Sequence, residues 1–184
     1  GRPGYHRAVA RRLPLLAVAV LLRLCGPGRA RADTAPTCDA GDAVWKNPAF
    51  CLSLPIGWRA SDRHKPRERL AVFALNGDES AASPRVKVTW VPRQGTTFAA
   101  RAAAAIKGVA AAAVLRDRAR AGARVWRIKD SQGERSAAVV AGAEHFFTCQ
   151  ATSGTGPEAR DLPAAAVAIC ETLAVPGGGS IAEP

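Results

Sequence analysis

The chain has 184 residues and a formal net charge of +11, from 26 lysine and arginine residues against 15 aspartate and glutamate residues. Seven of the basic residues and none of the acidic ones lie in residues 1–32, so the rest of the chain has 19 basic residues and a net charge of +4. That balance excludes the strongly basic domain typical of nucleic-acid binding, and we expect no nucleic-acid partner. Residues 33–184 are enough for one domain with a real core.

Residues 1–32 have the three parts of a secretory signal peptide. Four arginines precede an uncharged apolar run from Leu13 to Leu22, and an Ala-Arg-Ala site follows at 30–32. A helix of this run would rise about 15 Å, half of a hydrocarbon core of about 30 Å, so the run is too short to span a membrane. We expect an exported protein, periplasmic or secreted, that is cleaved after Ala32 and has no transmembrane span after cleavage. Lipid anchoring at Cys25 is the alternative.

Four cysteines follow the signal peptide: Cys38, Cys51, Cys149 and Cys170. An even number of cysteines in an exported chain indicates disulfides. Of the three pairings, we favour Cys38–Cys51 and Cys149–Cys170, because each joins two cysteines of one local segment. A zinc site is not expected, since the chain has no C-x-x-C pair and only His64 and His145 remain after cleavage. We expect neither a metal nor a cofactor.

The first half of the mature chain predicts an N-terminal extension and then strands. Residues 33–48 are polar and turn-rich, and apolar runs at 49–54, 70–75 and 85–91 follow. In the last run Val86, Val88 and Trp90 alternate with polar residues. This alternation is typical of an antiparallel sheet with one covered face.

The second half predicts two helices around three more strands. Residues 96–115 have Thr96 or Thr97 as N-cap and an apolar stripe at three- and four-residue steps, which favours a helix packed on the core. Strands are expected at 124–129, 136–141 and 145–151, a closing helix at 162–173 and a short strand at 173–175. Residues 49–175 form a single domain in this interpretation, and residues 176–184 form a flexible tail.

The predicted domain opens with FCLSLPIGW at 50–58 and closes with FTCQA at 147–151 and AICETLAV at 168–175. These three segments resemble exported domains of the PsbP/Mog-like fold, including LpqN-type envelope proteins. The resemblance implies an α+β sandwich, in which two main helices pack against an antiparallel sheet of about five to seven strands. It also implies a binding, accessory or assembly role rather than catalysis.

Basic residues gather in two segments and predict an anionic partner. One cluster lies between the first two predicted strands, at Arg59, Arg63, Lys65, Arg67 and Arg69. The other follows the long predicted helix, at Arg116, Arg118, Arg120 and Arg124. The partner would be an acidic protein, lipid or glycan of the envelope, bound by a monomer. The alternative is an ordinary solvated surface.

We expect no catalytic site, because no nucleophile motif accompanies the histidines. Two other functions stay open on the sequence. An envelope hydrolase would use His145 with Glu144. A secreted protease inhibitor would present a rigid loop closed by Cys38 and Cys51.

Overall fold

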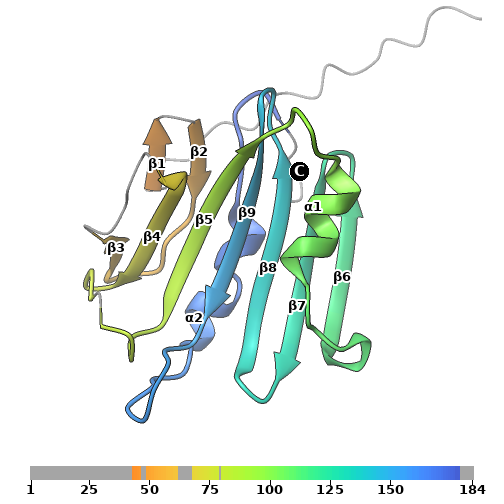
Figure 1. The fold of residues 1–184 in the computed structure, drawn as a ribbon. Helices are drawn as coiled ribbons and strands as arrows, with labels where there is room; N and C mark the ends of the chain where they lie inside the picture. The colour runs from red at the N-terminus through yellow and green to blue at the C-terminus, as the bar shows by residue number, and fades with distance from the viewer. Residues whose placement is uncertain (1–42, 47–48, 62–67, 79, 179–184) are drawn as a thin grey trace, which may run out of the picture. The chain divides into compact units, whose positions relative to one another are not determined.

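The computed structural model describes residues 43–46, 49–61, 68–78 and 80–178, which form a mostly β structure (Figure 1). Its centre is a seven-stranded antiparallel sheet with the order β3-β4-β5-β9-β8-β7-β6. The strands of this sheet are β3 (Trp58–Ala60), β4 (Leu70–Leu75), β5 (Arg85–Pro92), β6 (Val114–Arg120), β7 (Ala123–Asp130), β8 (Gly133–Ala141) and β9 (His145–Thr152).

The described part of the chain also has a second sheet and short helical segments. The second sheet is the antiparallel pair β1 (Ala43–Lys46) and β2 (Ala49–Leu52). The helical segments are α1 (Phe98–Ala105), α2 (Ala164–Val167) and the 3₁₀ turns η2 (Ala111–Ala113) and η3 (Ile169–Thr172). The expected antiparallel sheet of up to seven strands and the two helices are confirmed, and this mostly β arrangement is compatible with the expected α+β class. No helix in the described part of the chain is long and apolar enough to cross a membrane.

One face of the seven-stranded sheet, here called the inner face, carries the larger core. The predicted alternation in β5 is confirmed, because Val86, Val88 and Trp90 are all buried on this face. Phe50 of β2 packs on it, with its ring centroid 6.2 Å from Trp90 and 5.9 Å from Phe147. The inner face is covered by residues of β2, of the loop before α2, of α2 and η3, and of the segment after η3. They are Phe50, Leu52, Leu162, Ala166, Val167, Ile169, Cys170, Leu173 and Val175.

The opposite face, here called the outer face, is covered by α1 over only part of its width. Ala102 and Ala105 pack on Trp126 and Val139 and their neighbours in β7 and β8. Figure 1 shows α1 in front of the sheet and α2 behind it. No described helix lies over the outer face of β3, β4 and β5.

The long helix predicted at 96–115 is wrong beyond residue 105. Thr97 is its N-cap, as predicted, and its hydroxyl oxygen accepts a hydrogen bond from Ala100 N at 3.1 Å. The helix does not continue because Gly108 has φ of +82°, which is not helical. Residues 114–120 instead form β6, which the alanine-rich sequence concealed and which pairs with β7.

Three further predictions need correction. The strand predicted at 49–54 is β2, and it pairs with β1 rather than joining the large sheet. Residues 43–46 lie in the predicted N-terminal extension but form β1. The closing helix predicted at 162–173 is divided into α2 and η3, and the strand predicted at 173–175 is a single bridge between Cys51 and Ala174.

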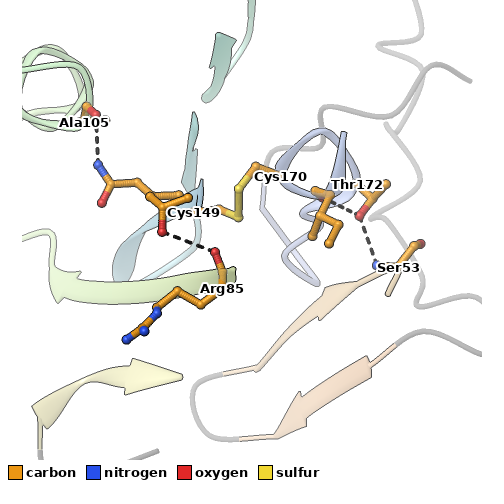
Figure 2. Close-up of a disulfide and its surroundings, with 9 residues drawn as sticks. Ser53, Arg85, Ala105, Cys149, Cys170 and Thr172 are labelled. Carbon is orange, nitrogen blue, oxygen red and sulfur yellow. Dashed lines mark hydrogen bonds between the residues drawn. A yellow bond between two sulfur atoms is a disulfide. The ribbon is translucent and has the colours of Figure 1, made fainter. Parts of the chain in front are cut away.

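The C-terminal segment is joined to the sheet by a disulfide (Figure 2). Cys149 of β9 and Cys170 of η3 are bonded, with their Cα atoms 5.5 Å apart, and both residues are 0% exposed. This is the local pairing favoured on the sequence. Cys51 is also disulfide-bonded, and because Cys149 and Cys170 pair with each other, its partner lies outside the described residues, where Cys38 also lies.

Backbone and side-chain hydrogen bonds hold the same segment to β2. Cys51 N donates to Ala174 O at 2.8 Å, and Ala174 N donates to Cys51 O at 3.1 Å. Ser53 N donates to the Thr172 hydroxyl oxygen at 3.0 Å (Figure 2). The C-terminal segment is therefore attached at two neighbouring elements, β9 through sulfur and β2 through hydrogen bonds.

We predict that loss of the Cys149–Cys170 bond strongly destabilises the fold. The bond joins residues 21 positions apart, and a loop of that size contributes about 3 kcal/mol in the chain-entropy model. The variant Cys149→Ala/Cys170→Ala should lose about that much free energy of unfolding in urea denaturation. An unchanged urea midpoint would show that packing alone holds the C-terminal segment.

Candidate functional site

The structure describes two of the five residues in the first predicted basic cluster. Arg59 lies in β3 and is exposed, and its guanidinium donates to Asn76 O at 2.6 Å. Arg69 is exposed just before β4, and its carbonyl accepts from Trp90 N at 3.1 Å. The other three members lie outside the described residues: Arg63, Lys65 and Arg67. The cluster as a whole is therefore not placed.

The register of the sheet brings Arg59 together with basic residues of β5. Ala74 of β4 is directly opposite Arg59 on one side and Arg85 on the other, and Lys87 is opposite Val72. Opposite residues in antiparallel strands point to the same face, so these three basic side chains share the outer face. We call Arg59, Arg85 and Lys87 the outer basic surface.

These three basic side chains are more exposed than Ala74, which lies between Arg59 and Arg85. Arg59 and Lys87 are exposed and Arg85 is half-buried, whereas Ala74 is 1% exposed. Arg85 donates to Ser80 O at 2.7 Å. The aliphatic stems of long basic side chains can cover small apolar neighbours while their charged ends stay in water. The sheet here is thus covered by cations and not by a helix.

A fourth cation borders this surface from α1. Arg101 donates through Nη2 to the Thr148 hydroxyl at 3.1 Å, and Thr148 is opposite Thr89 of β5. The Nε atom of Arg101 is buried and has no hydrogen-bond partner within the described residues.

No acid stands among the outer-face positions of these three strands. On β3, β4 and β5 those positions hold Arg59, Leu70, Val72, Ala74, Arg85, Lys87, Thr89 and Val91. The adjoining β4–β5 loop contributes Asp78, but its carboxylate already accepts from Ser80 N at 2.9 Å, from the Ser83 hydroxyl and from Arg160 at 2.8 Å. The cations of the outer basic surface are therefore not neutralised from within the described strands.

These contacts lower the pKa of Asp78 to about 2 from an ordinary value of 3.8. The hydrogen bond from the Ser83 hydroxyl is the largest cause, followed by the bond from Ser80 N, and Arg160 adds an opposite charge. An ionised, locally satisfied Asp78 fixes the loop that joins the two strands of the surface.

The second predicted basic cluster is divided between the two faces of the seven-stranded sheet. Arg116, Arg118 and Arg120 point to the inner-face side, whereas Arg124 of β7 lies on the outer side and binds Asp117 through two bonds of 2.8 and 2.6 Å. These bonds lower the pKa of the Asp117 carboxyl. Since β3 and β6 are opposite edges of the seven-stranded sheet, six strand spacings or roughly 29 Å separate Arg59 from the three arginines of β6.

Arg118 is engaged by an acid of the C-terminal segment. It donates to Glu171 at 2.5 Å, and Arg127 of β7 donates to the same carboxylate through Nε at 2.9 Å and also through Nη2. Glu171 is only 15% exposed at its side chain. Hydrogen bonds to Glu171 and to Glu134 raise the pKa of Arg127 even though its burial acts in the opposite direction. This group of charges is a structural contact between η3 and the sheet.

The residues named for a hydrolase are not assembled into a catalytic pair. His145 begins β9, and its ring meets Phe147 edge-on at 6.3 Å between centroids. Glu144 is exposed, and its carbonyl accepts from Arg93 N at 2.9 Å. Within the described residues, no hydrogen bond joins the His145 ring to Glu144 or to a serine. The inhibitor hypothesis depends on Cys38, which lies outside the described residues.

Two of the cations in this surface were missed by reasoning from the sequence. Arg85 and Lys87 alternate with the buried valines of β5, so the sequence predicts only that they face water. Their proximity to Arg59 depends on the register across β4, which no local pattern contains. In the described part of the chain, no group of three or more His, Cys, Asp or Glu residues could hold a metal ion.

Comparison with known proteins identifies no family for this chain. No protein-family model matches the sequence, and no curated protein matches it. The similarity to the PsbP/Mog-like fold therefore stays a prediction.

We predict that the stabilising contacts of Asp78 are lost in strong acid. Because its pKa is below the ordinary value, their contribution is fully present above pH 3.8 and is lost as the pH falls through about 2. The difference in unfolding free energy between the wild type and Asp78→Asn should be constant above that window and shrink inside it, in urea titrations at a series of pH values. Ser83→Ala should move the loss to higher pH. A difference that stays constant down to pH 2 would contradict the assignment.

Proposed function

We propose that the chain is a non-catalytic binding module of the bacterial envelope and that it holds an anionic partner on the outer basic surface. The observation that carries this proposal is the cross-strand placement of Arg59, Arg85 and Lys87 on a part of the sheet that has no described helix over it and no acid among its outer-face positions. Like charges gathered without acids destabilise a fold, so an anion bound between them relieves repulsion.

The geometry favours binding by several weak contacts over one deep site. The three cations project from two strands separated by β4, so Arg59 and Arg85 are roughly 10 Å apart at their backbones. That spacing suits a partner that carries several negative groups, such as a phospholipid surface, an acidic polypeptide or a sulfated glycan. Arginine can hold carboxylate, phosphate or sulfate groups through two parallel N–H donors.

Two features support the envelope as the place of action. The buried Cys149–Cys170 disulfide is typical of proteins that fold in an oxidising compartment. The proposed signal peptide at residues 1–32 would deliver the chain there. A PsbP/Mog-like sandwich, in which a binding or accessory role is common, is our proposal for the fold family.

We predict that reversing one charge on the outer basic surface weakens anion binding. Lys87→Glu should lower the affinity by about tenfold or more, because it removes an attraction and adds a repulsion. The probes are vesicles that contain phosphatidylglycerol, polyglutamate and a sulfated oligosaccharide, each measured at 50 and 300 mM salt. Binding should weaken at the higher salt because exposed charges are screened.

The matched control is Lys129→Glu, which makes the same change of charge at an exposed position of β7. It should bind the probes nearly as the wild type does. Equal losses in the two variants would mean that only net charge matters, and the outer basic surface would then not be a site. Absence of binding to all three probes would also overturn the proposal.

A further inference from the structure

Ile56 lies in the connection between β2 and β3, and its side chain is fully exposed. Ile56 and Leu115, which is 56% exposed, are the large hydrophobic side chains that stand in water within the described residues. A single exposed apolar residue is common on protein surfaces and is not by itself a site. Ile56 differs from Leu115 in the turn that holds its backbone and in the cation beside that turn.

The backbone around Ile56 is fixed as a tight turn. Trp58 N donates to Pro55 O at 3.0 Å, so Ile56 and Gly57 are the two central residues of a β-turn. Gly57 has φ of +85°, the left-handed value that glycine adopts at the second central position of a type II turn. Asn76 N donates to Gly57 O at 2.6 Å, which joins this turn to the turn after β4. These two hydrogen bonds hold Ile56 in its exposed position.

The segment around Ile56 is apolar and continues into the core. Residues 54–57 have the sequence Leu-Pro-Ile-Gly and carry no charge. Leu54 is half-buried and packs on the inner-face core, as does Leu75 at the end of β4. A Cβ atom added to Gly57 would meet Leu75 Cδ1 at 3.2 Å, so the turn lies directly on that leucine. We call residues 54–57 the apolar turn, and Ile56 is its exposed end.

Arg59 places a positive charge beside the apolar turn. Its guanidinium donates to Asn76 O at 2.6 Å, and the N–H of the same Asn76 holds the apolar turn. A Cβ atom added to Gly77 would lie 3.0 Å from Arg59 Nε. The Arg59 side chain therefore lies over the turn after β4, next to the apolar turn. This end of the outer basic surface thus combines a cation with an exposed apolar side chain.

Acidic side chains at this end of the sheet limit the part that can meet an anion. Asp78 forms an ion pair with Arg160 at 2.8 Å. The segment between β9 and α2 carries exposed Glu158 and Asp161, and its backbone hydrogen bonds to the β4–β5 loop involve residues 81 and 82 of that loop. An anionic surface would repel those two exposed acids. We therefore expect contact at the apolar turn and Arg59 rather than along the whole end of the sheet.

An exposed apolar side chain beside a cationic surface fits a lipid membrane better than it fits other anionic partners. A bilayer presents anionic headgroups for basic side chains and, directly beneath them, an apolar layer for an inserted side chain. An acidic polypeptide or a sulfated glycan supplies the charges without such a layer. We infer that the partner of the outer basic surface is an anionic phospholipid membrane, into which Ile56 inserts while the basic side chains meet the headgroups. This inference rests on the proposed function and names its partner.

The test compares two serine variants in binding to phosphatidylglycerol vesicles, polyglutamate and the sulfated oligosaccharide. Ile56→Ser should weaken vesicle binding about tenfold, because the gain from moving the isoleucine side chain out of water is lost. It should leave binding to the two soluble polyanions unchanged. Leu115→Ser is the matched control, since it removes the other exposed large hydrophobic side chain, in β6, and it should bind all three probes as the wild type does.

A tryptophan variant tests insertion directly. Ile56→Trp should bind the vesicles at least as tightly as the wild type, because tryptophan favours the membrane interface. Bromine atoms on the lipid acyl chains should quench its fluorescence more than they quench that of the wild type. Leu115→Trp should show no such gain in quenching, and an equal gain in the two variants would contradict insertion at Ile56.

Failure of this inference is distinguishable from failure of the proposed function. Equal vesicle affinities of Ile56→Ser and Leu115→Ser would overturn insertion, and a remaining loss in Lys87→Glu would then keep the anionic site. An equal loss of polyglutamate or oligosaccharide binding in Ile56→Ser would show that its effect does not depend on lipid, which would also overturn the inference. Absence of wild-type binding to every probe would overturn the proposed function and this inference together.

Discussion

The attachment of the C-terminal segment to the inner face determines which part of the sheet the described helical segments leave uncovered. The Cys149–Cys170 disulfide joins η3 to β9 near the middle of the strand order, and Ala174 bridges to Cys51 of β2. Apolar residues of β2, α2 and η3 then complete one core with Val86, Val88 and Phe147. Because this layer uses all three of these elements on one side, α1 and η2 are the described helical segments that pack on the other side. The eight-residue α1 packs over β8 and β9, and Trp126 of β7 belongs to the same apolar cluster.

Uneven coverage explains the charge pattern of the outer face. Under α1 the outward residues include apolar Trp126 and Val139 together with Thr148, whose hydroxyl accepts a hydrogen bond from Arg101. Where no described helix lies over the sheet, they include Arg59, Arg85 and Lys87. Arg101 stands at the boundary, with one nitrogen bound to Thr148 and another buried without a partner in the described structure. The outer face thus changes from a packing surface under α1 to the basic surface for which we propose anion binding.

Local patterns in the sequence predicted the elements that have one buried face and one face in water. The alternation at 85–91 predicted β5 because its valines are buried while Lys87 is in water. The same reasoning failed at 96–115, since alanine has high helix propensity and its stripe is compatible with a helix well past Gly108. What makes residues 114–120 a strand is pairing with β7, including the contact of Asp117 with Arg124. Of the outer basic surface, the sequence predicted only Arg59 as part of a basic cluster. The proximity of Arg85 and Lys87 to Arg59 depends on the strand register.

The most direct measurement is a nuclear magnetic resonance titration of the protein with tripolyphosphate, a small soluble polyanion. If uneven coverage of the sheet creates the binding surface, the largest amide shifts will fall in β3, β4 and β5, around Arg59, Ala74 and Lys87. Residues of the inner-face core and of α2 will shift little. Shifts that are largest elsewhere, or that spread evenly over all exposed basic residues, would contradict the central claim that this open part of the outer face is the site.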